Sequence, residues 1–190
     1  MIPLANDMQA QMKPNRNGNL TMYADEGAAS VTPGEAMLLY GMVRALRPVT
    51  VFEIGAAYGY STLHLATACR DNGLGRVYST EPHDWRRTVA REWVNRAGLA
   101  DWADVEREYT QLDHMINLAF IDAVHTAEAV AKYLLFLAPR LAVNATIVAH
   151  DACWAEHVEQ ALARVGLQSW PCVTLCNTSQ KGMAIIGVRS

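Results

Sequence analysis

Lysine is scarce in this sequence, and with it the basic surface that a nucleic-acid partner requires. The formal net charge is -3, and most of the 16 basic residues are arginines. Arginines do gather on a predicted helix near residues 86–96, but Glu92 lies among them and a solvated helix face explains them. The composition therefore indicates no nucleic-acid partner. The only lysines are Lys13, Lys132 and Lys181.

Long hydrophobic runs and paired metal-binding cysteines are also missing. The longest apolar stretch is interrupted by Pro139, Arg140 and Asn144, and no basic N-terminal region precedes a continuous apolar core, so we expect a cytoplasmic protein without a membrane partner. The four cysteines lack the C-x-x-C spacing of a zinc site. We expect them to remain thiols in a reducing compartment. They are Cys69, Cys153, Cys172 and Cys176.

The 190 residues suit a single domain with a sizeable core. Residues 1–30 are polar and show no periodicity, so we predict a flexible arm or lid there. Residues 31–190 are predicted to form one domain. It begins with Thr32-Pro33-Gly34-Glu35, a capping box with proline at the first helical position.

Strands and helices alternate along the rest of the chain. The predicted strands lie at 49–54, 76–80, 103–107, 116–121 and 145–149, followed by two more at 169–175 and 183–188. Helical patterns fill most of the intervals, which favours a mainly parallel sheet covered on both sides. The last two strands are joined by a hairpin-type connection. We therefore predict an α/β fold with a doubly wound, seven-stranded, mostly parallel sheet and a C-terminal antiparallel hairpin.

The first strand of this sheet runs into a glycine-containing turn. The sequence Glu53-Ile54-Gly55-Ala56-Ala57-Tyr58-Gly59 lacks the G-x-G-x-x-G spacing that closes on a pyrophosphate. A carboxylate at position 53 suits a cation better. Hydroxyls at Ser61 and Thr62 are expected to cap the next helix. Glu81 ends the second strand about 20 residues beyond the glycines, where an acid can accept ribose hydroxyl protons.

Two further strands end in acids with histidines beside them. One exit reads Phe120-Ile121-Asp122-Ala123-Val124-His125 and the other Ala149-His150-Asp151-Ala152. Adjacent parallel strands lie about 4.8 Å apart, so the two aspartates would repel each other unless a cation, a proton or a histidinium lies between them. The pair indicates a functional site.

Together these motifs resemble the class I S-adenosylmethionine-dependent methyltransferases over residues 30–188. The resemblance is to two branches: the cation-dependent catechol and caffeoyl-CoA O-methyltransferases, and a broader bacterial group of small-molecule methyltransferases. It implies a Rossmann-like fold and S-adenosylmethionine as cofactor. The cofactor-binding residues it implies are Glu53, Gly55, Ala56, Ala57, Tyr58, Gly59, Ser61, Thr62, Glu81, Tyr109 and Asp122.

The chain departs from the cation-dependent branch at two positions. There, two aspartates and an asparagine directly after the second bind magnesium, and a lysine three residues after the first acts as base. This chain has Ala152 in place of the asparagine and His125 in place of the lysine. A divalent cation therefore stays an open question, with Asp122, Asp151 and His150 as its candidate ligands. His125 needs no metal to accept a hydroxyl proton near neutral pH.

We therefore predict an O-methyltransferase that acts on a small hydroxylated molecule. The catalytic candidates are His125, Asp122, His150 and Asp151, while the other four histidines are expected to be structural or solvated. Methylation of nitrogen or of a carboxylate stays open, because neither needs other cofactor residues. Two alternatives remain: a nicotinamide-dependent oxidoreductase and a catalytically silent cofactor-binding protein. A homodimer is a family-level expectation.

Overall fold

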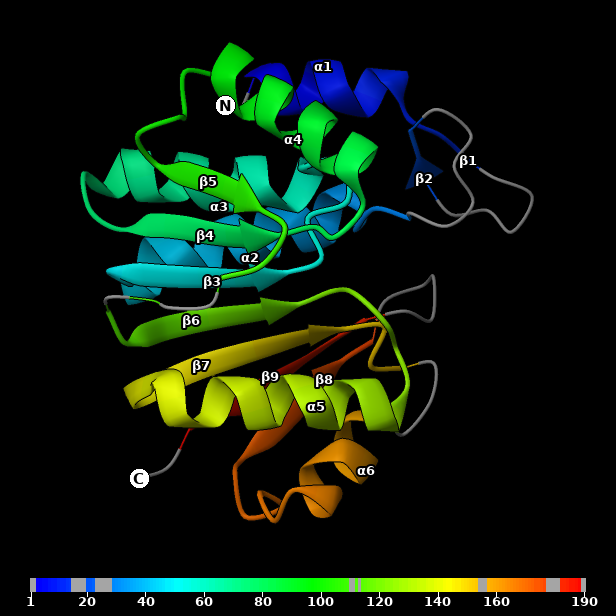
Figure 1. Ribbon diagram of the computed structural model, residues 1–190, viewed down its shortest axis with the longest axis vertical. Helices are drawn as coiled ribbons and strands as arrows, with labels where there is room; N and C mark the ends of the chain where they lie inside the picture. Colours follow the sequence, from blue (N-terminus) through cyan, green and yellow to red (C-terminus); the bar gives the residue numbers. More distant parts are fainter. Residues whose placement is uncertain are drawn as a thin grey trace. The chain divides into compact units, whose positions relative to one another are not determined.

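The computed structural model describes residues 3–14, 20–22, 29–109, 112, 114–153, 157–176 and 182–188. Its main sheet has seven strands in the order β5-β4-β3-β6-β7-β9-β8 (Figure 1). The pairs β4–β5, β3–β6 and β6–β7 are parallel, whereas β9 pairs antiparallel with both β7 and β8. The predicted α/β fold, with its mostly parallel sheet and antiparallel terminal strands, is confirmed.

The chain divides into two compact units, one of residues 1–49 and 55–110 and the other of residues 50–54 and 111–190. The prediction of one domain over residues 31–190 stays a prediction. The first unit contains the helices α1 (Pro3–Gln11), α2 (Pro33–Leu46), α3 (Tyr60–Asn72) and α4 (Asp84–Arg96) and the strands β1 (Lys13–Pro14), β2 (Leu20–Thr21), β4 (Arg76–Thr80) and β5 (Ala103–Glu106).

Helix α3 is the centre of the first unit. It packs against α1, α2, α4 and β4, and α4 in turn packs on β5. Its residues from Tyr60 to Cys69 are all buried, which a helix covered by neighbours on several sides requires. In the described part of the chain, none of the helices combines the length and the apolar character that crossing a bilayer demands.

Helix α1 was missed by the sequence analysis, which expected no regular structure before residue 31. Its buried residues Ala5 and Met8 and the buried Met12 directly after it are spaced by three and four positions, as on one helix face, but the helix has only nine residues. The Tyr60 hydroxyl donates a hydrogen bond to Gln9 Oε1 at 3.3 Å, which ties α1 to α3. Whether the segment acts as a lid stays a prediction, and part of it lies outside the described residues.

The second unit contains the strands β3 (Thr50–Ile54), β6 (Ile116–Ile121), β7 (Leu141–His150), β8 (Cys172–Leu175) and β9 (Met183–Gly187), the helices α5 (Ala127–Leu137) and α6 (His157–Arg164), and the short 3₁₀ helix η1 (Ala138–Arg140). Helix α5 packs against β6 and α6, and Figure 1 shows it crossing in front of β7, β8 and β9. The rings of buried Phe52 and half-buried Phe136 lie 5.8 Å apart in this unit.

The strand register of the second unit brings the carboxyl ends of β3, β6 and β7 to the same edge of the sheet. Ile54 is level with Ile121, and Ile121 is level with Ala149. The Asp122 amide continues the ladder by donating to the Ile54 carbonyl at 2.8 Å. The residues that follow β6 and β7 therefore start side by side, as expected for the carboxyl ends of parallel strands.

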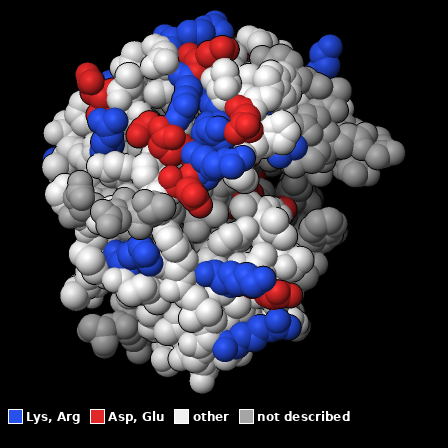
Figure 2. Space-filling model, in the orientation of Figure 1, with Lys and Arg blue, Asp and Glu red and all other residues white. Residues whose placement is uncertain are grey.

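Two of the four arginines of α4 form ion pairs with acids. Arg87 forms an ion pair with Asp84, and Arg91 forms one with Glu106. Figure 2 shows blue and red atoms intermixed over the area where Figure 1 draws α4 and β5. Each pairing offsets part of the positive charge, which supports the interpretation of this helix as a solvated face.

The capping box predicted at the start of α2 is confirmed. The Thr32 hydroxyl accepts a hydrogen bond from the Glu35 amide at 3.3 Å, and Glu35 Oε2 accepts one from the Thr32 amide at 2.8 Å. We expect Thr32→Ala to lower the free energy of unfolding by about 1 kcal/mol, since an N-terminal amide loses its acceptor. Urea titration of the two proteins measures the difference. Thr32→Ser is the matched control, because it keeps the hydroxyl. Equal midpoints for the alanine variant and the wild type would contradict the capping role.

Candidate functional site

The glycine-containing turn of the first unit follows Ile54 and leads into α3. The amides of Gly55 and Ala56 both donate to the Thr80 carbonyl, at 3.0 and 2.9 Å. Gly59 has φ +92°, and a Cβ at this position would lie 3.2 Å from the Cα of Ala90. Only glycine meets both the left-handed backbone and the close approach of α4 without a shift. Ala57 also has a positive φ, +47°, so the turn is tightly constrained.

The hydroxyls predicted to cap α3 do not do so. The N-cap residue is Gly59, without a side-chain hydrogen bond, and the helix begins at Tyr60. Gly59 turns the chain directly into the helix, so Ser61 and Thr62 fall within the first helical turn, where both are buried. This part of the sequence interpretation was wrong. Ser61 and Thr62 are the second and third residues of the helix, whereas a capping hydroxyl must come from the residue before its first turn.

Glu81 lies directly after β4 and closes on this turn. Its Oε2 accepts a hydrogen bond from the Ala57 amide at 2.9 Å, and its Oε1 accepts one from the His83 amide at 2.9 Å. The side chain is buried, at 5% exposure. Two backbone donors therefore hold the carboxylate in one orientation, while each oxygen keeps a second lone pair for a further donor.

Aromatic rings surround the same part of the first unit. The Tyr58 and Trp85 rings meet edge to face with centroids 5.5 Å apart, and those of Tyr78 and Tyr109 meet likewise at 5.7 Å. Burial, with the negative charge of Asp104, raises the pKa of Tyr109 well above its ordinary value, so its hydroxyl stays protonated.

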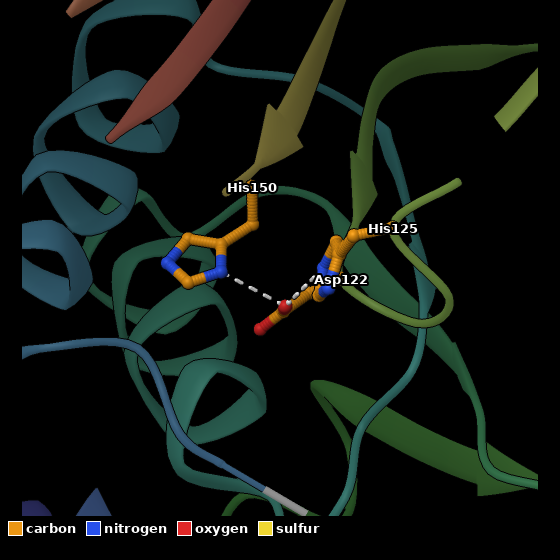
Figure 3. A group of neighbouring side chains, drawn as sticks. All are labelled: Asp122, His125 and His150. Atoms are coloured by element: carbon orange, nitrogen blue, oxygen red, sulfur yellow. Dashed lines mark hydrogen bonds and ion pairs between the residues drawn. The ribbon is translucent and has the colours of Figure 1, made fainter. Parts of the chain in front are cut away.

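The second unit brings the four catalytic candidates into one cluster. His125 Nε2 lies 3.2 Å from Asp122 Oδ1, and His125 Nδ1 lies 3.2 Å from Asp151 Oδ2. His150 Nδ1 lies 3.0 Å from Asp122 Oδ1 and 3.4 Å from Asp151 Oδ1. Figure 3 shows the Asp122 carboxylate between the two imidazoles, one from the end of β7 and one from the loop after β6. The cluster alternates acids and histidines.

This alternation controls the charge state of Asp122. Burial alone would raise the pKa of its carboxyl, but the positive charge of His150 and the hydrogen bond from His125 outweigh burial and hold the pKa well below its ordinary value. Asp122 is therefore ionised at neutral pH. Two neighbouring carboxylates require a cation or a proton between them, and the two imidazoles occupy that position.

The same residues offer a donor set for a metal ion. One ligand atom from each of Asp122, His125 and His150 lies within 4.8 Å of the others. This set fits a divalent transition metal, because imidazole and carboxylate together suit manganese, iron or zinc. The ligand set expected from the sequence named Asp151 in place of His125.

One histidine near the cluster was missed by the sequence analysis. His157, at the start of α6, is buried, and its ring centroid lies 6.1 Å from that of His125. It was expected to be structural or solvated because it has no partners in the sequence comparable to those of His125 and His150. Only the packing of α6 against α5 brings it close, and no sequence signal could have found it.

The expectation that all cysteines remain thiols is wrong. Cys153 and Cys176 form a disulfide across 23 positions of sequence, whereas Cys69 and Cys172 are free. The spacing of the pair gave no signal, since the antiparallel pairing of β9 with both β7 and β8 is what places the two residues together.

We expect the contribution of Asp122 to stability to depend on pH. Its pKa is lower in the folded protein than in the unfolded chain, so the contribution is complete above the unfolded value, about 4, and is lost as the pH falls below it. Asp122→Asn should lower the free energy of unfolding by on the order of 2 kcal/mol at pH 7 and by less at pH 3, where part of the contribution has been lost. Urea titrations at both pH values test this. Asp101→Asn, at an exposed position, is the control and should leave the free energy of unfolding nearly unchanged at either pH. If Asp122→Asn lowered the free energy of unfolding equally at both pH values, the electrostatic cause would be contradicted.

Comparison with known proteins identifies the family. The sequence profile of a family described as a methyltransferase domain matches residues 52–152. A Mycolicibacterium smegmatis protein provisionally named as an O-methyltransferase is 31% identical over 106 residues, which is 52% of this chain and 50% of the relative. The chain thus spans about half the length of the curated relatives it matches.

Two solved structures share the fold. The O-methyltransferase of Bacillus cereus, solved with S-adenosylhomocysteine, superposes with a TM-score of 0.73 at 18% identity, over 99% of this chain and 90% of the other. TomG of Streptomyces achromogenes, an O-methyltransferase of tomaymycin synthesis solved with S-adenosylmethionine, superposes with a TM-score of 0.68 at 16% identity, over 85% and 82%. With a match that extends from β3 to the residues after β7, the chain belongs to the methyltransferase-domain family.

Proposed function

We propose that this protein is an S-adenosylmethionine-dependent O-methyltransferase that acts on a small hydroxylated molecule, with His125 as general base. The observation that carries the proposal is the position of His125 between two carboxylates, 3.2 Å from each, in a chain of the methyltransferase-domain family. The relatives named above as O-methyltransferases support the class of reaction. The family match favours this proposal over the alternative of a nicotinamide-dependent oxidoreductase.

For the cofactor, the proposal assigns the ribose to Glu81 and the methionine part to the turn from Gly55 to Gly59. The carboxylate of Glu81 is already oriented by the Ala57 and His83 amides and has lone pairs left for two hydroxyls. Glu53, fully buried on β3, and Asp122 complete the acidic residues proposed to face the cationic cofactor. The remaining proposed contacts are Tyr58, Ser61, Thr62 and Tyr109.

For the chemistry, His125 would take the acceptor's hydroxyl proton as the oxygen attacks the sulfonium methyl. A neutral imidazole donates from one ring nitrogen and accepts at the other, so the acceptor hydroxyl must replace one of the two carboxylates next to His125. After the transfer, the imidazolium has two N–H donors, and Asp122 and Asp151 lie where both can be accepted. The observed arrangement suits the protonated product of this step.

A metal-assisted route is a second candidate, favoured by the grouping of Asp122, His125 and His150. A divalent cation bound there would act as a Lewis acid on the acceptor oxygen. The two routes exclude each other at His125, because a nitrogen lone pair that holds a metal is not available for a proton. A catalytically silent protein remains the third candidate.

The acceptor is proposed to be a small molecule. Arg87 and Arg91 are paired with acids. This pairing argues against a role in binding the phosphates of a nucleic acid. A homodimer and a cytoplasmic location remain proposals.

The cofactor assignment predicts that metal-stripped protein binds S-adenosylhomocysteine with one-to-one stoichiometry. Glu81→Gln should weaken this binding about tenfold or more, since a charged acceptor for the ribose hydroxyls is lost. Calorimetric titration measures both. Glu92→Gln, at an exposed position on α4, is the matched control and should bind as the wild type does. No binding to folded wild-type protein would overturn the methyltransferase proposal.

The base assignment predicts that His125→Asn lowers kcat about 10²- to 10⁴-fold, the usual contribution of general base catalysis, while the affinity for S-adenosylhomocysteine stays unchanged. Transfer of labelled methyl groups to a panel of small phenols, catechols and aliphatic alcohols provides the assay.

His114→Asn is the control for this experiment, because His114 is exposed and lies outside the cluster. Chelation separates the two routes. Full activity after treatment with EDTA supports His125 as base, whereas loss of activity that added manganese restores would replace the base with the metal-assisted route.

A further inference from the structure

The disulfide between Cys153 and Cys176 lies close to the His–Asp cluster along the chain. Cys153 follows Asp151 by two residues, and Asp151 contacts both His125 and His150. The bond joins the loop after β7 to the residue after β8. The loop that carries the Asp151 carboxylate is therefore linked covalently, through Cys153, to the end of β8.

The surrounding backbone is shaped to accommodate this bond. Gly182 has φ +64°, and a Cβ there would overlap both Cys153 Sγ and the Leu175 carbonyl oxygen. The Gly182 carbonyl in turn accepts a hydrogen bond from the Ala152 amide at 3.3 Å. Any residue other than glycine would push the bond and the loop apart, so the disulfide and its glycine form one packed unit.

Asp151 depends on this support. Its φ of +57° places a non-glycine residue in the left-handed region, which persists only where the surroundings hold it. On one side its carboxylate contacts the two histidines, and on the other the chain is fixed by the Ala152 amide and by Cys153. Breaking the disulfide removes the covalent part of that support.

The bond is also accessible to a reductant. Cys176 is exposed and Cys153 is half-buried. The free cysteines are poor competitors for thiol exchange, because burial raises the pKa of Cys69 to about 12 and burial also raises that of Cys172. The disulfides that form in reducing compartments are usually transient, and they serve catalysis or redox sensing rather than structural stability.

We propose that the Cys153–Cys176 bond is a redox-sensitive positioning element, which holds Asp151 and His150 against His125 when it is oxidised and releases them when it is reduced. The effect on methyl transfer rests on the function proposed above, whereas the effect on the geometry of the cluster does not. Cys153 and Cys176 take no part in the methyl transfer itself.

The switch needs a dithiol as its reductant. A thiolate of the dithiol attacks Cys176 Sγ, the bond between the two cysteines breaks, and Cys153 leaves as a thiolate that takes up a proton. The second thiol of the reductant then attacks the mixed disulfide and releases Cys176 as a thiol. The protein gains two electrons and two protons, and the dithiol becomes a disulfide; an oxidised dithiol reverses the exchange.

The test compares oxidised protein with protein treated with dithiothreitol. Thiol counting in denaturant should give two thiols per chain before reduction and four after it. In histidine-labelled protein, the ring signals of His125 and His150 should shift and broaden on reduction, while those of His64, buried in α3, stay in place. Reoxidation should restore the spectrum. With an acceptor from the assay above, kcat should fall about tenfold or more, since misplacing a catalytic group by about 1 Å has effects of this size, and KM for S-adenosylmethionine should not change.

Two variants complete the experiment. Cys153→Ser combined with Cys176→Ser should reproduce the spectrum of the reduced wild type, and Cys172→Ser, which keeps the bond and removes a free thiol of β8, should behave as the oxidised wild type. Four thiols in the oxidised protein, or two with no change in the His125 and His150 signals on reduction, would overturn the proposal. Failure of the methyltransferase proposal would show instead as absent cofactor binding in both redox states, with the spectral change intact.

Discussion

The candidate site depends on one electrostatic constraint, the closeness of two carboxylates at the ends of neighbouring parallel strands. Asp122 follows β6 and Asp151 follows β7, and the register of these strands makes them neighbours. Two neighbouring carboxylates require a cation or a proton between them. His125 and His150 lie there, each within 3.4 Å of both carboxylates. Proton transfer, metal binding and the position of the disulfide all relate to this cluster.

In the first unit, a different interaction matters: the Glu81 carboxylate is held beside the turn from Gly55 to Gly59. Gly59 allows α4 to approach, and the amides of Ala57 and His83 orient Glu81. The two groups of proposed residues, one in each unit, thus depend on different interactions. Backbone donors orient a single carboxylate in one, and side-chain charges balance one another in the other.

Local signals predicted much of this structure. The strand at Arg76–Thr80 and the strand at Ile116–Ile121 agree with the sequence analysis to the residue, because short alternating or apolar runs between turns leave few other choices. The capping box at Thr32 was recognisable for the same reason, since its hydrogen bonds span only three residues. Helix α1 was missed, because nine residues of mixed polarity give a weak periodic signal.

The sequence by itself determined the order of the elements, the glycine turn, and the acids and histidines at the strand exits, because each of these depends on residues close together along the chain. Only the tertiary structure decided that His150 contacts Asp122, that His157 lies near His125, and that Cys153 bonds Cys176. These contacts depend on strand register and helix packing over long separations, where no residue pattern specifies which side chains will meet. The motif could be predicted, whereas the charge balance around it had to be observed.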